Sequence, residues 1–229
     1  MKKKKVVVLT GAGISAESGI KTFRDADGLW EGHDVMAVAS PEGWRKNKAL
    51  VLEFYNQRRA QLQTVAPNAA HYALAELEAG YEVTIITQNV DDLHERGGST
   101  NVLHLHGELK KVRSTTDPRL VYDRETAIEL GDQCEKGSQL RPHIVWFGED
   151  VPLIGKAGKI AQEADVFIIV GTSMQVYPAA GLVNVVDSDA DKYFIDPKPA
   201  AVDVPNLRVI EDTASTAVPS LVKQLLDAL

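Results

Sequence analysis

The chain has 229 residues, 44% of them hydrophobic, so it can bury a core as one domain or as a large domain with a small one attached. Its net charge of −7 argues against direct binding to nucleic acid, because phosphate backbones require a basic protein face. The single cysteine, Cys134, excludes an intrachain disulfide framework and no apolar run is long enough to span a membrane, so we expect a cytoplasmic protein without membrane contact.

Short apolar segments predict strands at intervals along the whole chain. They lie at Lys5–Thr10, Glu82–Thr87, Asn101–Leu105, His143–Phe147, Asp165–Val170, Lys192–Ile195 and Leu207–Ile210. Helical periodicity occurs at Lys48–Gln63, Asn68–Ala79, Ile154–Glu163 and Thr216–Leu226. Apolar strands interleaved with helices predict an α/β fold with a Rossmann-like parallel sheet that is covered on both faces.

Two segments interrupt this alternation of strands and helices. Residues 26–67 contain no predicted strand, and residues 108–142 are polar and charged. We therefore expect a smaller inserted module at about 27–67 and 108–142. The Rossmann-like core would take about 1–26, 68–107 and 143–229, and all of 1–229 would form a single unit.

The first predicted strand runs directly into Gly-Ala-Gly-Ile-Ser at residues 11–15. Paired glycines between a strand and a helix can aim backbone N–H groups at a phosphate, but they also suit any tight strand-to-helix turn. Polar residues also follow two later strands, in Gln-Asn-Val-Asp at 88–91 and Leu-His-Gly at 105–107. Because the carboxyl ends of parallel strands meet at one edge of the sheet, these groups are predicted to converge there.

A hydride-transfer dehydrogenase would share this glycine-rich start. It also requires an acidic residue at the end of a second strand, about 20 residues after the glycines. Glu31 and Asp34 lie near that distance, but the segment around them is not a predicted strand. The sequence therefore favours a loop over NAD rather than a second mononucleotide unit.

Two further motifs, Trp-Phe-Gly-Glu at 146–149 and Gly-Thr-Ser at 171–173, complete a set of five in order. From about residue 6 to about residue 215, the set resembles the sirtuin family of NAD-dependent protein-lysine deacylases. By this resemblance, the NAD pyrophosphate and ribose would be held by Gly11, Ala12, Gly13, Ser15, Glu17, Phe23, Arg24, Gln88, Asn89, Asp91, Gly171, Thr172 and Ser173. Asn89 and Asp91 are also residue types that cap helices, and the two roles are compatible.

The family's His-Gly pair implies that His106 is the catalytic base, acting with Asn89 at the ribose. An imidazole with an ordinary pKa near 6.5 suits proton removal at neutral pH, although strand direction alone does not separate His106 from His104. In the reaction that the resemblance implies, the acyl-lysine oxygen attacks the nicotinamide ribose. Nicotinamide leaves, and the products are free lysine and O-acyl-ADP-ribose.

The resemblance also implies that Val145, Trp146, Phe147 and Gly148 hold the substrate peptide by strand addition, although Trp146 and Phe147 could instead belong to the core. Residues 51, 55, 58 and 62 share one helical face, on which Arg58 interrupts an apolar stripe. Tyr55 and Arg58 resemble the pair of the subgroup that removes succinyl, malonyl and glutaryl groups. The alternative is that the Arg58 side chain extends its charged end to solvent or pairs with Glu53 or Asp34.

Sirtuins usually hold a structural zinc with two Cys-x-x-Cys pairs. Here the four positions read Ser114, Asp117, Cys134 and Gly137, so we expect no zinc, even though Asp117, Asp132 or His143 could be considered as replacement ligands. The expected function is removal of acidic acyl groups from protein lysines. A deacetylase, a mono-ADP-ribosyltransferase and a silent NAD-binding module remain the alternatives.

Overall fold

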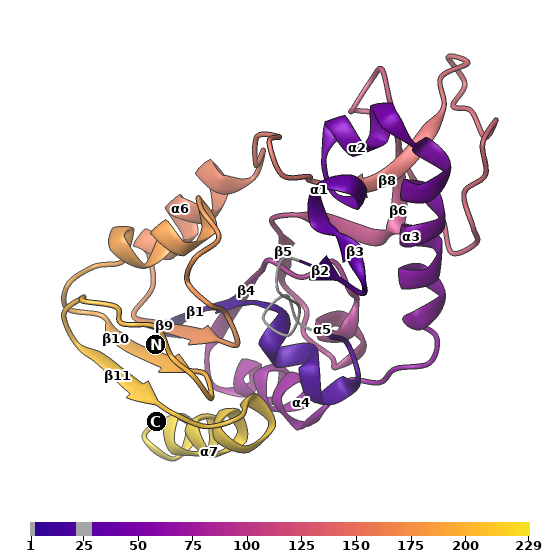
Figure 1. The fold of residues 1–229 in the computed structure, drawn as a ribbon. Coiled ribbons are helices and arrows are strands. Elements are labelled where there is room, and N and C mark those ends of the chain that lie inside the picture. The colour runs from indigo at the N-terminus through magenta and orange to yellow at the C-terminus, as the bar shows by residue number, and fades with distance from the viewer. Residues whose placement is uncertain (1–2, 22–28) are drawn as a thin grey trace.

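A six-stranded parallel sheet forms the centre of the computed structural model, which describes residues 3–21 and 29–229 (Figure 1). In spatial order the strands are β11 (Leu207–Ile210), β10 (Asp191–Ile195), β9 (Val166–Val170), β1 (Lys5–Thr10), β4 (Glu82–Thr87) and β5 (Val102–His104). All six lie at segments where the apolar runs predict strands. The α/β, Rossmann-like fold class is therefore confirmed.

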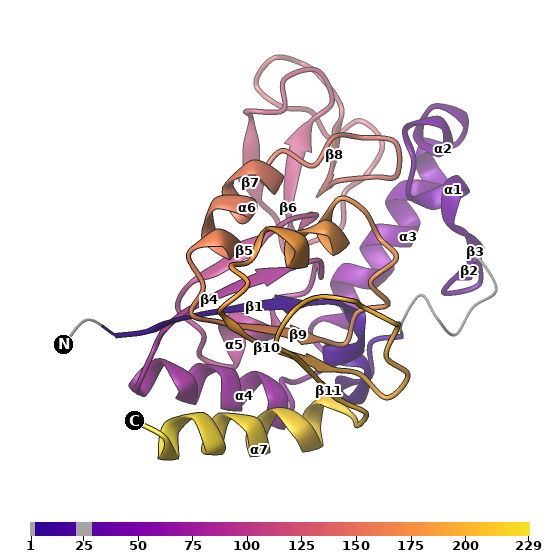
Figure 2. The ribbon, with the colours of Figure 1, turned by 90° about the vertical axis from the view of Figure 1, so that its left-hand side faces the viewer.

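Helices cover both faces of this sheet, and successive strand residues point alternately to the two layers. In β1, Val6 and Val8 pack in the cluster that includes α4 (Ala69–Glu76) and α7 (Ala214–Asp227). Val7 packs in the cluster on the opposite face of the sheet, which includes residues of α6 (Ile154–Gln162) and of the 3₁₀ helix η4 (Ala179–Val185). Figure 2 shows α4 and α7 side by side below the sheet and α6 above it. Across residues 3–21 and 29–229, no helix has the length and apolar character needed to cross a membrane.

The order of strands reverses at β1, whose neighbours are β4 on one side and β9 on the other. In open parallel sheets, ligands bind outside the carboxyl ends of the strands at such a reversal. The 3₁₀ helix η1 (Ala12–Ser18) follows β1 at this point. The helix α4 continues into the 3₁₀ helix η3 (Leu77–Ala79), and α5 (Leu93–Arg96) follows β4.

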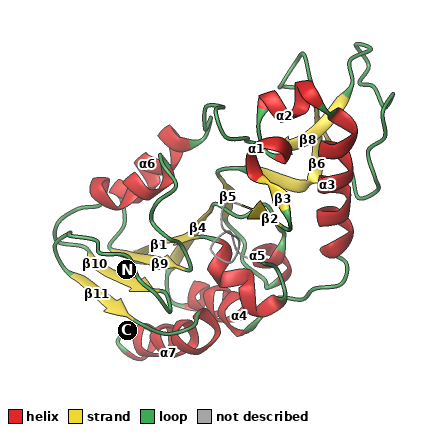
Figure 3. Ribbon diagram, in the orientation of Figure 1, coloured by secondary structure: helices red, strands yellow, loops and turns green. Residues whose placement is uncertain are grey.

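A smaller module contains a second, antiparallel sheet in the order β7 (Val121–Asp123), β6 (Gly107–Ser114) and β8 (Leu140–Ile144). It packs with α1 (Val35–Val38), α2 (Pro41–Lys46) and α3 (Lys48–Gln61), beside a short hairpin of β2 (Leu29–Trp30) and β3 (His33–Asp34). Figure 3 shows these helices and strands grouped apart from the parallel sheet.

This module corrects two predicted features of the chain. The strand predicted at 143–147 ends at Ile144, and it pairs with β6 rather than joining the parallel sheet, so residues 143–144 lie with the small module. The residues expected to form a polar insertion after Gly107 instead begin with the long strand β6. The hairpin of β2 and β3 contains Glu31 and Asp34, away from the parallel sheet, as the argument against a dehydrogenase requires.

Candidate active site

Three glycines bring the carboxyl ends of β1 and β9 into direct backbone contact. The amide of Gly13 donates to the Gly171 carbonyl at 2.8 Å, and that of Gly11 donates to the Val170 carbonyl at 3.0 Å. A Cβ on Gly13 would lie 2.6 Å from the Gly171 Cα, and one on Gly171 would lie 2.3 Å from the Ile14 nitrogen. Only glycine allows this approach. These two amides are therefore used within the protein, and Ala12 lies half-buried between the two glycines.

A buried polar group lies beside this turn and joins η1 to the segment after β4. The Ser15 hydroxyl donates to Asp91 Oδ2 at 3.1 Å and accepts from Asn89 Nδ2 at 3.2 Å. Burial raises the pKa of Asp91 to about 6, although hydrogen bonds from Ser15 and from the Leu93 amide act in the opposite direction. The Leu93 amide donates to Asp91 Oδ1 at 3.1 Å, so Asp91 lies just before α5, whose N-cap residue is Asp92.

The other predicted NAD contacts are distributed around this group. Gln88 Nε2 donates to Thr172 Oγ1 at 3.1 Å, which joins the ends of β4 and β9. Ser173 is half-buried one residue further along the chain. The carboxylate of Glu17 accepts from the amide and hydroxyl of Ser215, so it is held at the start of α7 rather than beside Ser15. Phe23 and Arg24 lie outside the described residues.

His104 and His106, which the sequence does not distinguish, differ in their hydrogen-bond partners. His106 Nδ1 lies 3.0 Å from the Gln88 carbonyl, which can only accept, so the proton of the neutral ring is on Nδ1 and Nε2 has the lone pair. Burial lowers the pKa of His106, and the Gln88 bond opposes this effect. His104 instead faces Glu95 Oε1 at 2.7 Å and the Asn89 carbonyl at 3.2 Å. Burial lowers its pKa, but Glu95 outweighs this and the net shift is upward.

The segment after β8 passes between His106 and the small module. The Val145 amide donates to the His106 carbonyl, and the Phe147 amide donates to the Ala39 carbonyl, both at 2.9 Å. Trp146 is buried in the apolar cluster of the module, as the core alternative predicts, whereas Phe147 is 42% exposed. The chain then turns at Gly148, which has a φ of +88°.

Tyr55 is fully buried, and Trp146 fixes the direction of its hydroxyl. Trp146 Nε1 donates to Tyr55 Oη at 3.1 Å, so the tyrosine accepts there and keeps its own proton for another partner. Burial raises the pKa of Tyr55, which keeps the hydroxyl protonated. Arg141, which the sequence analysis did not identify, stacks on Trp146 with its Cζ 3.2 Å from the ring centroid, and it donates to Glu149. The sequence signal for this residue was a charged side chain within the mostly buried strand β8.

Arg58 lies one helical turn after Tyr55 on α3 and has unused donors. Its Nε and Nη1 are buried without a hydrogen-bond partner in 3–21 and 29–229, while Nη2 is 3.4 Å from Gln57 Oε1. Its Cζ lies 4.7 Å from the ring centroid of Phe54. Burial lowers the pKa of Arg58, and the charge of Glu31 opposes this shift. The two carboxylates considered as alternatives bind elsewhere: Glu53 accepts from Gln57, and Asp34 accepts from the Met36 amide.

Comparison with known proteins identifies the origin of this arrangement. The model of the Sir2 family matches residues 11–178. The chain belongs to the Sir2 family. The sirtuin resemblance of its motifs is therefore confirmed.

Relatives of this Sir2 family chain cover nearly its whole length. A Helicobacter pylori protein named NAD-dependent protein deacylase is 60% identical over 225 residues, which are 98% of each chain. A Bacteroides thetaiotaomicron protein of the same name is 53% identical, with 97% of this chain and 98% of its own length covered. Among solved structures, a Sir2 homologue mutant with ADP-ribose has a TM-score of 0.90 at 39% identity, covering 99% of this chain and 93% of its own. A Sir2 homologue–NAD complex has a TM-score of 0.88 at 40% identity, covering 99% and 91%.

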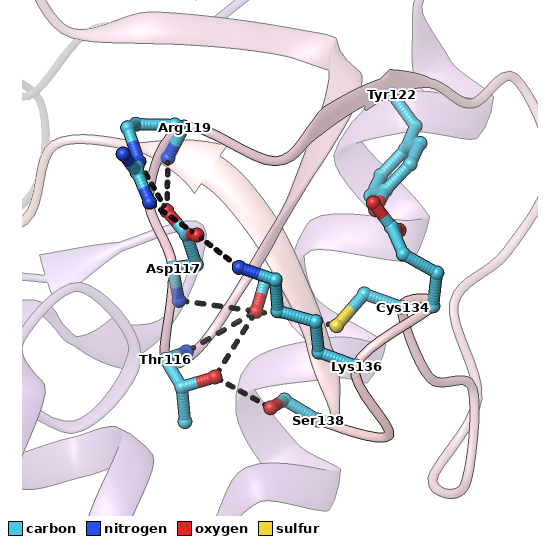
Figure 4. Close-up of polar contacts among 9 residues, drawn as sticks. Thr116, Asp117, Arg119, Tyr122, Cys134, Lys136 and Ser138 are labelled. Carbon is cyan, nitrogen blue, oxygen red and sulfur yellow. Dashed lines mark hydrogen bonds and ion pairs between the residues drawn. The ribbon is translucent and has the colours of Figure 1, made fainter.

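The four positions where sirtuins usually bind zinc do not fit a metal in this Sir2 family chain (Figure 4). Ser114 Oγ accepts from the Cys134 thiol at 3.4 Å, and Gly137 has no side chain. The Asp117 carboxylate is bound by Arg119 at 2.9 Å and by Lys136 at 2.8 Å. Of the residues that the structure describes, no group of three His, Cys, Asp or Glu could hold a metal ion. Hydrogen bonds and ion pairs therefore join the two loops at this end of the module.

Proposed function

We propose that the chain is an NAD-dependent protein-lysine deacylase in which His106 is the general base. The observation that carries this proposal is the bond from His106 Nδ1 to the Gln88 carbonyl, because it leaves Nε2 as the basic atom at the end of the parallel sheet. General base catalysis of this kind contributes about 10² to 10⁴ in rate. The names of the curated relatives support the same activity.

NAD would bind across the reversal of strand order, with its pyrophosphate on the turn after β1. When bound, it supplies a ribose carbon that can accept the acyl oxygen as nicotinamide leaves. Ser15, Asn89 and Asp91 already form a buried hydrogen-bonded group beside that turn, and hydroxyl, amide and carboxyl groups are of the kinds that bind ribose hydroxyls and a carboxamide. The remaining contacts proposed for NAD are Gly11, Ala12, Gly13, Gln88, Gly171, Thr172 and Ser173.

The substrate would be an acylated lysine in a protein, with its backbone laid along residues 145–148. Phe147 is exposed there and Gly148 turns the chain, so a peptide strand can approach the segment. The net charge of −7 is compatible with a lysine-containing segment and unfavourable for nucleic acid. The single cysteine supports a cytoplasmic location.

The acyl group would be acidic, namely succinyl, malonyl or glutaryl. Nε and Nη1 of Arg58 are buried without partners in the described chain, and they lie on opposite edges of the guanidinium. A carboxylate could therefore accept a bidentate pair from one of them together with Nη2, whose contact to Gln57 is long at 3.4 Å. Tyr55 is oriented by Trp146 so that its hydroxyl proton remains to be donated. An acetyl group would leave both donors unsatisfied, which disfavours it in a buried site.

One assay tests the activity and the acyl preference together. The protein is incubated with NAD and with succinyl, acetyl and unmodified forms of one peptide, and nicotinamide and peptide mass are followed. We expect the fastest turnover on the succinyl form, at least about 100-fold loss in His106→Asn, and a much smaller loss in His104→Gln. A larger loss in His104→Gln would contradict the assignment of the base. Transfer of ADP-ribose from NAD to protein, without loss of the acyl group from the peptide, would instead indicate an ADP-ribosyltransferase.

A further inference from the structure

Two histidines without an assigned role are buried behind the proposed NAD site. His71 on α4 is 0% exposed and His94 on α5 is 1% exposed. Their rings meet edge to face, with centroids 5.0 Å apart and planes at 62°. One nitrogen of each ring, Nε2 of His71 and Nδ1 of His94, has no hydrogen-bond partner among the described residues. Buried polar atoms without partners are rare, so this pair requires an explanation.

The outer partner of His71 fixes its tautomer. The backbone amide of Asn68 donates to His71 Nδ1 at 3.2 Å, so this nitrogen has the lone pair and the neutral ring is protonated at Nε2. The Asn68 side chain in turn reaches η1, where its Nδ2 donates to the Ile14 carbonyl at 2.8 Å and to Ser18 Oγ at 3.0 Å. His71 is therefore connected to the turn on which the pyrophosphate would lie.

The outer partner of His94 fixes the opposite role for its inner nitrogen. The Thr10 hydroxyl donates its only proton to Thr87 Oγ1 at 2.8 Å, so toward His94 Nε2, 3.0 Å away, it can only accept. The neutral His94 ring is then protonated at Nε2 and has its lone pair on Nδ1. Thr87 Oγ1 also accepts from the Asn89 amide at 3.0 Å, which connects His94 to the ribose side of the site.

We propose that His71 and His94 are positioning residues for NAD, acting as a matched pair in which His71 Nε2–H donates to one buried water that in turn donates to His94 Nδ1. The pair completes a chain of hydrogen bonds from η1 to the Asn89 backbone and so holds the two sides of the NAD site at a fixed separation. This inference rests on the proposed placement of NAD beside Ser15 and Asn89. Burial lowers the pKa of His71 to about 4 and that of His94 well below its ordinary value, so both rings are neutral at neutral pH, as the pair requires.

The protonation pattern can be measured directly. Long-range proton–nitrogen correlation spectra of the intact protein, labelled with ¹⁵N-histidine, should show both rings as the Nε2–H tautomer at neutral pH. Assignment of the two rings by comparison with His71→Gln and His94→Gln completes the measurement. An Nδ1–H tautomer or an imidazolium at either position would overturn the proposal.

Kinetics test the positioning role. Replacement of either histidine by Phe should raise the KM for NAD by about tenfold, the loss expected for one hydrogen bond of about 1.4 kcal/mol, while the KM for the acyl peptide changes less than about twofold. His71→Gln, which can still accept and donate, should recover most of the loss. The matched control is Leu77→Ala, because Leu77 is as buried as the two histidines but its side chain has no polar atom and takes no part in the hydrogen bonds that connect them to the site. It should lower the melting temperature without moving the KM for NAD.

The outcomes separate this proposal from the proposed function. If Leu77→Ala raises the KM for NAD as much as His71→Phe does, the effect is only one of stability and the positioning role is refuted. If Asn89→Ala leaves the KM for NAD unchanged, the placement of NAD itself is refuted. If Asn89→Ala raises that KM and the histidine variants do not, only the histidine pair is refuted.

Discussion

Replacement of Arg58 by Met removes the guanidinium while it keeps a long apolar side chain against Phe54. A carboxylate can pair with Nη2 of Arg58 and with one of its two buried unpartnered donors, Nε or Nη1, and each charge-assisted hydrogen bond contributes about 1.5 to 3 kcal/mol. Because a bidentate pair rarely gives twice the single value, we take about 3 to 4 kcal/mol for the change. This corresponds to a fall of about 10² to 10³ in kcat/KM for a succinyl-lysine peptide.

The assay compares succinyl and acetyl forms of one peptide with wild type, Arg58→Met and Arg58→Lys. We expect the acetyl rate of Arg58→Met to equal or exceed that of wild type, because no hydrogen bond to an acetyl group is lost and the donors that an acetyl group leaves unsatisfied are removed. Arg58→Lys should give an intermediate succinyl rate, since it retains charge without the planar fork. Exposed Arg45→Met on α2 serves as a control for the loss of one positive charge. Equal losses on both peptides in Arg58→Met would refute the acyl-binding role.

Four further outcomes are expected. Gly171→Ala should abolish measurable NAD binding in calorimetry, because the new Cβ would lie 2.3 Å from a backbone nitrogen; unchanged affinity would contradict the close approach. Trp146→Phe should lower kcat/KM on the succinyl peptide by about threefold, as Tyr55 loses its orienting donor, and should leave the acetyl peptide unaffected. Burial raises the pKa of the Asp91 carboxyl to about 6, so the protonated group favours folding and this contribution is lost as the pH rises through 6. The free energy of unfolding of Asp91→Asn, measured by chemical denaturation, should therefore rise by about 1.4 kcal/mol relative to that of wild type between pH 5 and pH 8. An equal difference between the two proteins at both pH values would refute this expectation. Dialysis against EDTA should change neither the melting temperature nor the activity, and a joint fall of both would indicate a structural metal.

The parallel sheet and the position of the site follow from local patterns in the sequence. The apolar runs at 6–9 and 166–170 have no polar interruption, so they predict buried strands and place Gly11 and Gly171 near the same sheet edge. Of the face predicted on α3, Val51 and Tyr55 are fully buried, Leu62 is buried just past the last helical residue, and Arg58 is half-buried.

Other features depended on contacts that no local pattern shows. Strand β6 alternates buried and half-buried residues, but an irregularity between Glu108 and Val112 interrupts the period of two. Because two lysines also lie in this stretch, the sequence does not predict a strand there. Trp146 and Phe147 suggest a strand by composition, but the chain ends β8 before them because the Trp146 amide donates to the Glu149 carboxylate. The choice between His104 and His106 required partners that lie 9 to 18 residues away along the chain.

The small module is assembled from two stretches of chain that leave the large sheet and return to it, one after η1 and one after β5. In the proposed arrangement the dinucleotide binds at the edge of the parallel sheet, while α3 and the residues after β8 contact the acyl group. Substitutions in α3 or after β8 can therefore change which acyl group is removed without altering the parallel sheet. Such a division lets selectivity evolve on a scaffold whose chemistry stays constant.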